Sequence, residues 1–300
     1  MKNIKFFGSI PAIVTPFKKN GDLDLPALEK LVDYQLQNDV DGIVVAGSTG
    51  EVATMDEKEY STVLQTVVKK VSGKVPVVAG AGSNDTKKAI NLSKIAKDAG
   101  VDGLLHVTPY YNKPTPNGLV HHFKEIAKAV NLPIIIYNVP GRTGSNVSPQ
   151  TIIRVAREVS AVVAVKEASG SLNQMMEIIN EVSKNGPKDF VVLCGDDALA
   201  LPLISLGGKG CISVVCNETP KMFSDMIHFA LNEKFVEARK LHYKLLPLMN
   251  INFIESNPIP VKTALSMMGM MEDELRSPLV SIEEKNKSAI EKVLKELGLI

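Results

Sequence analysis

The feature that most constrains the fold of this chain is a set of short runs rich in valine and isoleucine. These runs are apolar at almost every position instead of at alternate positions. A strand shows this pattern when both of its faces are covered, as in a parallel sheet flanked by helices. Eight such runs are predicted to be strands, near residues 10–15, 42–46, 75–79, 103–107, 133–137, 162–166, 190–194 and 210–214.

Amphipathic segments between these runs predict helices. The clearest follows the second run, where the apolar residues of segment 60–71 are spaced i, i+3, i+4, i+7, as on one face of a helix. A capping box formed by Thr54 and Glu57 is expected to begin this helix, because each side chain can bind an otherwise unpaired backbone N–H.

Strand and helix alternate up to about residue 231, after which helical patterns follow one another near residues 233–249, 258–268 and 281–297. Eight strands in this alternation predict an α/β fold, a (β/α)8 TIM barrel, over residues 1–231. Residues 232–300 are expected to form a C-terminal helical extension that packs against the barrel or a neighbouring subunit. A doubly wound open sheet has the same alternation and is the alternative.

Charge and hydropathy limit the classes of function. The 34 basic and 33 acidic residues nearly cancel and form no long run of one sign, so no nucleic-acid partner is expected. No segment approaches the roughly 20 apolar residues of a membrane-spanning helix, and the first residues lack a signal-peptide pattern. We therefore expect a cytoplasmic protein that acts on a small molecule.

The sequence also lacks the motifs of common metal and nucleotide sites. Its three cysteines form no CxxC pair, and its five histidines form no HExxH pattern, so no metal site is expected. The glycine-rich segments lack both the lysine of a phosphate-binding loop and the third glycine of a dinucleotide-binding loop. We expect no nucleotide cofactor.

Polar residues follow four of the predicted strands. In a (β/α)8 barrel the loops that leave the C-terminal ends of the strands form the active site. The four segments are GSTGE at 47–51, TPYYN at 108–112, YNVPGRTG at 137–144 and KEASG at 166–170. We expect their side chains to meet at one end of the barrel.

Lys166 ends the apolar run 161–165, so its amine is expected to project into a site with little water. Burial disfavours the charged form of a lysine. A neutral lysine amine can attack a ketone or aldehyde, and the resulting imine withdraws electrons from the neighbouring carbon. The alternatives are a lysine paired with Glu167 and a lysine that extends to the barrel rim.

Three more strand-end residues could serve the same substrate. Tyr137 ends the preceding strand, and neighbouring strands lie about 5 Å apart, so its hydroxyl could reach the same substrate and transfer protons. The pattern is equally compatible with a tyrosine that packs in the core and binds the backbone through its hydroxyl. Ser48 and Thr49 suit a small carboxylate, although a structural turn uses similar residues. Arg142 follows a Pro-Gly turn and could grip a carboxylate with two hydrogen bonds, unless it is a surface arginine.

Tyr110 and Tyr111 lie in a loop bracketed by Pro109 and Pro114. Adjacent exposed aromatic residues are typical of protein interfaces, although they could instead form a local cluster. We expect at least one of the two tyrosines to contact another subunit.

Taken in order, the segments GSTGE, TPYYN, YNVPGRTG, VKEASG, CGDDALALP and GGKGCISV resemble the dihydrodipicolinate synthase family of pyruvate-dependent lyases and aldolases. The resemblance runs from about Ile10 to the C-terminus. It implies a barrel with C-terminal helices in which Lys166 forms an imine with pyruvate and Tyr137 relays protons. No cofactor is implied beyond this covalent imine.

The resemblance also implies roles for the hydroxyl residues. Ser48 and Tyr111 would complete a proton relay with Tyr137, and Tyr111 would come from the adjacent subunit. Thr49 would help to hold the pyruvate carboxylate. Ser48 stands where the family often has threonine. Serine keeps the hydroxyl but lacks the stiffness of a β-branched side chain.

The choice of the second substrate depends on Arg142. Its GRTG context is similar to that of the synthases, where the arginine binds the carboxylate of L-aspartate 4-semialdehyde, and neuraminate lyases lack it. Gly195 and Ile212 match positions that line the pocket near pyruvate. The implied activity is condensation of pyruvate with the semialdehyde in diaminopimelate and lysine biosynthesis, carried out by a homotetramer built as a dimer of dimers.

One departure from the family bears on regulation. Lysine-inhibited members bind lysine with an acidic group and histidines, at positions where this chain has Lys88, Glu57 and Tyr60. A cation in place of that carboxylate should repel the ammonium of the inhibitor, so weak or absent lysine feedback is expected. The alternatives to a synthase are another pyruvate-dependent aldolase, of the 2-keto-3-deoxy sugar acid or N-acetylneuraminate type, and a non-catalytic protein with the same fold.

Overall fold

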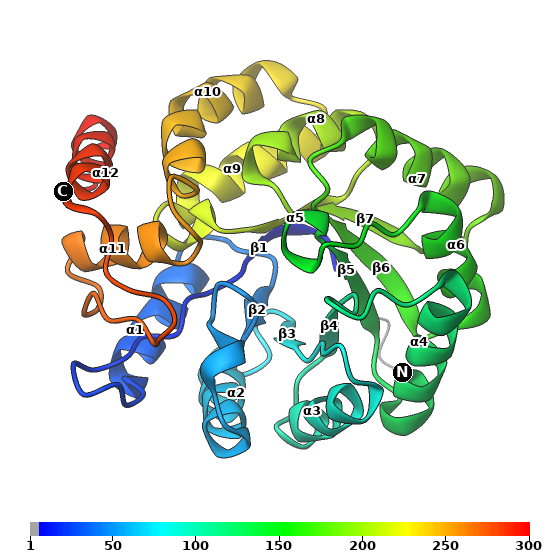
Figure 1. Ribbon diagram of the computed structural model, residues 1–300. Coiled ribbons are helices and arrows are strands. Elements are labelled where there is room, and N and C mark those ends of the chain that lie inside the picture. The colour runs from blue at the N-terminus through cyan, green and yellow to red at the C-terminus, as the bar shows by residue number, and fades with distance from the viewer. Residues whose placement is uncertain (1–5) are drawn as a thin grey trace.

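The computed structural model of the chain describes residues 6–300, in which parallel strands at the centre are surrounded by helices (Figure 1). The strands are β1 (Gly8–Pro11), β2 (Ile43–Val45), β3 (Val77–Gly80), β4 (Gly103–Val107), β5 (Ile134–Asn138), β6 (Val162–Glu167), β7 (Val191–Cys194) and β8 (Gly210–Ser213). The helices are α1 (Leu25–Leu36), α2 (Glu57–Val71), α3 (Thr86–Asp98), α4 (Pro116–Val130), α5 (Pro140–Thr143), α6 (Pro149–Glu158), α7 (Leu172–Asn185), α8 (Ala200–Ser205), α9 (Pro220–Leu231), α10 (Phe235–Ile251), α11 (Ile259–Met267) and α12 (Glu284–Leu297). Three short 3-10 helices are η1 (Val52–Thr54), η2 (Asp197–Leu199) and η3 (Val215–Asn217).

The strands form one ring. Their order is β1-β8-β7-β6-β5-β4-β3-β2, and every neighbouring pair is parallel. A parallel bridge between Ala12 and Val44 joins the two ends, and the Ile13 N–H donates to the Val44 carbonyl at 2.9 Å. The predicted (β/α)8 barrel is therefore confirmed, and the alternative of an open doubly wound sheet is wrong.

Two apolar layers result from the two faces of the strands. One fills the barrel interior and includes Ala164 of β6 and Ile135 of β5, while the other lies between the strands and the surrounding helices. Because successive side chains of a strand point to opposite faces, the inward direction of Ala164 also sends Lys166 inward. The same alternation on β5 brings Tyr137 into the interior.

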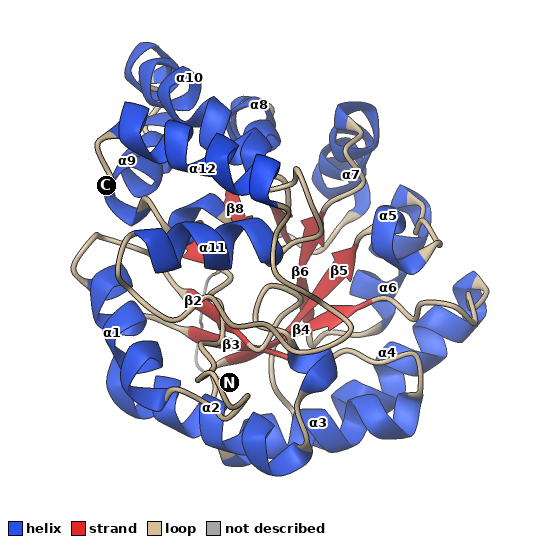
Figure 2. Ribbon diagram, turned by 60° about the vertical axis from the view of Figure 1, so that its left-hand side comes forward, coloured by secondary structure: helices blue, strands red, loops and turns tan. Residues whose placement is uncertain are grey.

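The three C-terminal helices pack beside the barrel. Helix α10 lies along α9, and α12 contacts both α10 and α11. Figures 1 and 2 both show α11 between α12 and α1, and it also contacts η3, which follows β8. The three helical patterns predicted after residue 231 are confirmed as α10, α11 and α12. The division of the chain into two units at that residue stays a prediction.

Two local predictions were wrong in detail. The first strand was expected at residues 10–15, but β1 ends at Pro11 and only a bridge to Val44 follows it. Beyond that bridge the Val14 N–H donates to Asn217 Oδ1, and the Thr15 hydroxyl donates to the Gly50 carbonyl. Val14 and Thr15 therefore do not continue the regular strand ladder.

The start of helix α2 also differs from the prediction. Asp56, not Thr54, caps the helix: its Oδ1 accepts from the Glu59 N–H at 2.8 Å, and Glu59 Oε2 accepts from the Asp56 N–H at 3.2 Å. The Thr54 hydroxyl instead donates to the Glu51 carbonyl within η1. The capping box exists two residues later, because the tight turn of η1 occupies the expected site.

Within residues 6–300, none of the helices combines the length and the apolar character that crossing a bilayer requires.

Candidate active site

A cavity of about 160 Å³ opens at the C-terminal ends of the strands. Three of the four predicted strand-end segments reach it, those that begin at Gly47, Tyr137 and Lys166, and the segment after β7 adds Gly195 and Asp196. Apolar and polar side chains line the cavity together, which suits a small organic acid.

Lys166 is the cationic side chain in the depth of this cavity. It is 6% exposed, and its Nζ lies 4.4 Å from the centre of the Tyr137 ring. Among residues 6–300 no carboxylate lies within ion-pair distance of this amine. An amine that faces the cavity and is not held in an ion pair can approach the keto carbon of a small organic acid, which suits nucleophilic chemistry.

Glu167 does not pair with Lys166, so that alternative is excluded. It points to the opposite face of β6, where its carboxylate accepts hydrogen bonds from the Asn138 amide at 3.0 Å and from the Ser169 N–H at 2.8 Å. The Gln174 amide also donates to it. The alternation of the strand therefore separates the two charges.

Tyr137 stands next to Lys166 in the barrel wall. The two residues are register partners on β5 and β6, and the tyrosine side chain is buried. Its hydroxyl makes no hydrogen bond with the described residues, unlike Tyr60, whose hydroxyl donates to the Gly80 carbonyl at 3.0 Å. The Tyr137 hydroxyl is thus placed at the cavity with its hydrogen-bonding capacity unused.

Gly195 provides the room that Lys166 occupies. A Cβ atom at this position would lie 2.9 Å from Lys166 Cε and 2.6 Å from the Cβ of Ala168. Both distances are shorter than a normal contact between carbon atoms. Any side chain at position 195 would therefore displace the lysine stem.

Thr49 and Arg142 are joined at the mouth by Asn257, which precedes α11. The Asn257 Nδ2 donates to Thr49 Oγ1 at 3.0 Å, and Arg142 Nη2 donates to the Asn257 carbonyl at 3.2 Å. Thr49 is buried, whereas Ser48 and Arg142 are exposed at the mouth. All four residues line the cavity.

Asn257 and Phe253 were not predicted from the sequence. Both line the cavity and come from the segment between α10 and α11. The available signal was a polar stretch with two prolines, FIESNPIP, between two helical patterns. That signal predicts a loop, but it cannot place the loop over the barrel.

Three predicted residues, Ile212, Tyr110 and Tyr111, lie outside the lining of this cavity. Ile212 is buried among the apolar side chains of the barrel interior. Tyr111 is 89% exposed and adopts a left-handed backbone conformation, with φ 69°. Its neighbour Tyr110 lines a second cavity of about 640 Å³, which also includes Ser48 and Arg142. In one chain, therefore, Tyr111 does not reach Tyr137.

The second cavity also contains the residues considered for regulation. Glu57, Tyr60 and Lys88 line it, on α2 and α3. Tyr60 is fully buried, and burial raises the pKa of its hydroxyl, so it serves as a neutral hydrogen-bond donor.

In the part of the chain that the structure describes, no group of three His, Cys, Asp or Glu side chains could hold a metal ion. Cys194, Cys211 and Cys216 are all buried and form no disulfide.

Comparisons with known proteins agree over nearly the whole chain. A family model described as the dihydrodipicolinate synthetase family matches residues 5–297. The 4-hydroxy-tetrahydrodipicolinate synthase of Methanocaldococcus jannaschii is 50% identical, covering 98% of this chain and 100% of the relative, and that of Maridesulfovibrio salexigens is 48% identical, covering 98% and 99%. The crystal structure of dihydrodipicolinate synthase from Thermotoga maritima is 45% identical, with a TM-score of 0.96 over 98% of this chain and 99% of that one.

Proposed function

Because this chain belongs to the dihydrodipicolinate synthetase family and is a lyase, we propose that it condenses pyruvate with L-aspartate 4-semialdehyde, the reaction of 4-hydroxy-tetrahydrodipicolinate synthases in diaminopimelate and lysine biosynthesis. The observation that carries the proposal is the buried Lys166 amine, which has no carboxylate partner among the described residues and faces the cavity beside Tyr137. No cofactor is required, because the imine itself withdraws the electrons.

The proposed reaction begins at Lys166. Its neutral amine attacks the keto carbon of pyruvate, water leaves, and an imine forms. The methyl carbon then loses a proton to give an enamine, which attacks the aldehyde carbon of the semialdehyde and leaves an alkoxide that takes up a proton. The amino group of the semialdehyde finally displaces Lys166 from the imine carbon, which closes the ring and releases the free lysine.

The proton transfers are assigned to hydroxyl groups. Tyr137 is within reach of Lys166, and Ser48 lines the same cavity at its mouth. Tyr111 of an adjacent subunit would complete the relay, and its exposure on an isolated chain is consistent with a partner that covers it. A hydroxyl relay suits the general acid and base steps that come before and after the carbon-carbon bond forms.

The two carboxylates of the substrates are assigned to different groups. Thr49 is buried, lines the cavity and is held by Asn257, and the pyruvate carboxylate would lie against it. Arg142 stands at the mouth, where its guanidinium would bind the carboxylate of the semialdehyde. Gly195 leaves space for the lysine stem, and Ile212 lies in the apolar packing beneath the site.

The assembly and location follow from the same proposal. A homotetramer built as a dimer of dimers would bring Tyr111 of one chain to the site of another, with Tyr110 in the same contact. Both tyrosines are exposed in the single chain, at 39% and 89% for Tyr110 and Tyr111. We propose that this enzyme works in the cytoplasm.

Borohydride reduction in the presence of pyruvate tests the chemistry. We expect mass spectrometry to find a reduced pyruvate adduct on Lys166 and on no other lysine. Lys166→Met, which keeps a side chain of similar size but lacks the amine, is the matched control and should carry no adduct. An unlabelled Lys166 in the folded wild-type protein would defeat the proposed function.

A substrate panel separates the synthase from other pyruvate-dependent aldolases. We expect aspartate semialdehyde to be consumed together with pyruvate. Faster cleavage of 2-keto-3-deoxy sugar acids or of N-acetylneuraminate would favour the alternative, which uses the same Lys166 and Tyr137.

Weak or absent feedback by lysine is part of the proposal. Lys88 lines the second cavity and would face the ammonium group of the inhibitor with a like charge. Lys88→Glu should therefore increase sensitivity to lysine, and Lys88→Gln should have a smaller effect. Strong inhibition of the wild-type enzyme by micromolar lysine would contradict this part of the proposal.

A further inference from the structure

The loop that carries Ser48 and Thr49 has a demanding backbone. Ala46 and Glu51, at its two ends, both have φ of 53°, in the left-handed region that residues with a side chain rarely adopt. Between them Gly50 lies so close that a Cβ would be 3.1 Å from the Ala46 backbone. Such a conformation persists only where contacts from outside the loop hold it in place.

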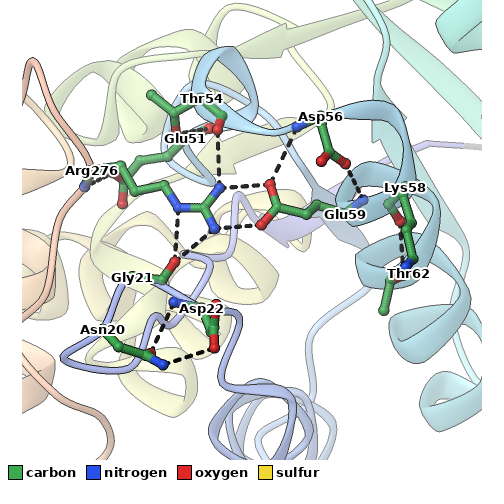
Figure 3. Close-up of polar contacts among 10 residues, drawn as sticks. All are labelled: Asn20, Gly21, Asp22, Glu51, Thr54, Asp56, Lys58, Glu59, Thr62 and Arg276. Carbon is green, nitrogen blue, oxygen red and sulfur yellow. Dashed lines mark hydrogen bonds and ion pairs between the residues drawn. The ribbon is translucent and has the colours of Figure 1, made fainter.

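The C-terminal extension supplies these contacts through Glu51. The Lys262 Nζ of α11 lies 2.6 Å from Glu51 Oε1, and the two side chains are 0% and 1% exposed. The other carboxylate oxygen accepts from the backbone N–H of Arg276 at 3.2 Å. Both oxygens of the carboxylate are therefore bound by residues of the extension, and Figure 3 shows Glu51 next to Arg276.

Lys262 also reaches the loop indirectly, through Thr15. Its Nζ also donates to the Thr15 carbonyl at 3.1 Å, and the Thr15 hydroxyl donates to the Gly50 carbonyl at 2.8 Å. The ammonium lies 4.4 Å from the centre of the Phe17 ring. Burial lowers the pKa of Lys262, and the charge of Glu51 opposes this effect. The amine is thus enclosed by partners that belong to, or contact, the loop.

Arg276 is itself anchored on the far side. Its guanidinium binds the Glu59 carboxylate and donates to the carbonyls of Thr54 and Gly21 (Figure 3). It also lies over the Phe17 ring, at 4.2 Å from the ring centre. These contacts join the segment after α11 to the first turn of α2, so the backbone N–H that meets Glu51 has a defined position.

We propose that Glu51 and Lys262 are a positioning pair, which sets the backbone of Ser48 and Thr49 against the Lys166 cavity and thereby determines how well pyruvate is bound. A buried ion pair adds little net stability compared with an apolar pair of the same size, so its main effect here is to select one loop conformation. This inference rests on the proposed function, because it assumes that the loop receives the pyruvate carboxylate.

The test is the pyruvate dependence of borohydride trapping in the double variant E51Q/K262M. This variant keeps neither charge of the buried pair. The methionine is close to lysine in volume, and the glutamine keeps an oxygen that can accept from the Arg276 N–H. The matched control is Thr263→Val, which removes the hydrogen bonds of the neighbouring α11 residue to Asp273 but touches no residue of the loop. Thermal unfolding and circular dichroism establish that each variant is folded.

We expect the half-saturating pyruvate concentration of the double variant to rise about three- to tenfold, the equivalent of one lost hydrogen bond. Trapping at saturating pyruvate should remain complete, because Lys166 is unchanged. Thr263→Val should keep the wild-type concentration dependence. Glu51→Asp, which retains the charge but shortens its reach, should give a smaller shift in the same direction and serves if the double variant does not fold.

Wild-type pyruvate dependence in the folded double variant, or in Glu51→Asp, would overturn the inference. An equal shift in Thr263→Val would also overturn it, because general loosening of the extension would then explain the result. Failure of the wild-type protein to form any adduct would instead refute the proposed function, so the two failures are distinguishable.

Discussion

Gly195→Ala is the substitution for which the structure predicts the most specific damage. The added Cβ would lie 2.9 Å from Lys166 Cε and 2.6 Å from the Cβ of Ala168. Carbon atoms in ordinary contact are about 3.5–4.0 Å apart, so the lysine stem must retreat by roughly 0.6 to 1 Å. We expect the fold to survive, because overpacking by one methyl group costs about 1–3 kcal/mol.

The functional loss should be larger than the loss of stability. A misplacement of about 1 Å at a reacting group can lower a rate by as much as 100-fold, so we expect adduct formation to slow by about 10- to 100-fold. The assay is the rate of borohydride-trapped pyruvate on Lys166, with the unfolding midpoint measured in parallel.

Gly141→Ala is the matched control for this experiment. A Cβ at Gly141 would meet nothing within 4 Å, and the residue lies in the short helix α5 without a left-handed backbone. Its rate should stay within about twofold of wild type, as is usual for a surface substitution. If folded Gly195→Ala trapped pyruvate at the wild-type rate, the proposed tight fit between Gly195 and Lys166 would be refuted.

Three further predictions concern the second substrate and the buried titratable groups. Arg142→Ala should raise the KM for aspartate semialdehyde about 10-fold or more, as expected from the loss of a charged hydrogen bond, while pyruvate trapping is unchanged. A parallel loss of pyruvate trapping would contradict the assignment of Arg142 to the second substrate. Burial lowers the pKa of His106 to about 3 from its ordinary 6.5, so the unfolded chain binds a proton that the folded protein excludes. The stability that comes from this exclusion is therefore fully present above pH 6.5, and it falls by up to about 1.4 kcal/mol per pH unit as the pH decreases towards the folded pKa. Denaturant unfolding of His106→Leu should show a shallower decline of stability with decreasing pH than the wild type. An identical decline in the two proteins would exclude His106 as the cause. Burial raises the pKa of Glu218, so the stability linked to its protonation is present below its ordinary pKa of 4.5 and is lost as the pH rises through the raised value. Glu218→Gln, which cannot ionise, should increase the thermal unfolding midpoint near about pH 8 but not near about pH 4. A lower midpoint than that of the wild type at the higher pH would contradict this account of Glu218.

The sequence alone determined the barrel, and it predicted that Lys166 and Tyr137 lie together in the candidate site. Strands covered on both faces need continuous apolar runs, and this signal lies within a few consecutive residues. The position of Lys166 at the end of such a run, with Tyr137 at the end of the preceding one, follows from the same local pattern. Their register as direct neighbours on β6 and β5 agrees with that prediction.

Local detail was less predictable where two short motifs compete. Thr54 and Glu57 satisfied the capping pattern, but Asp56 and Glu59 satisfy it as well, and the turn of η1 decided between them. Only the path of the chain before the helix distinguishes the two choices.

Tertiary structure decided how the site is held together. Glu51 and Lys262 are 211 residues apart in sequence, and Thr49 and Asn257 are separated by 208. No periodicity connects residues at such a distance, because their contact depends on where the C-terminal helices pack on the barrel. The inward direction of Lys166 is a property of one strand, whereas the loop that faces it is shaped by side chains from the far end of the chain.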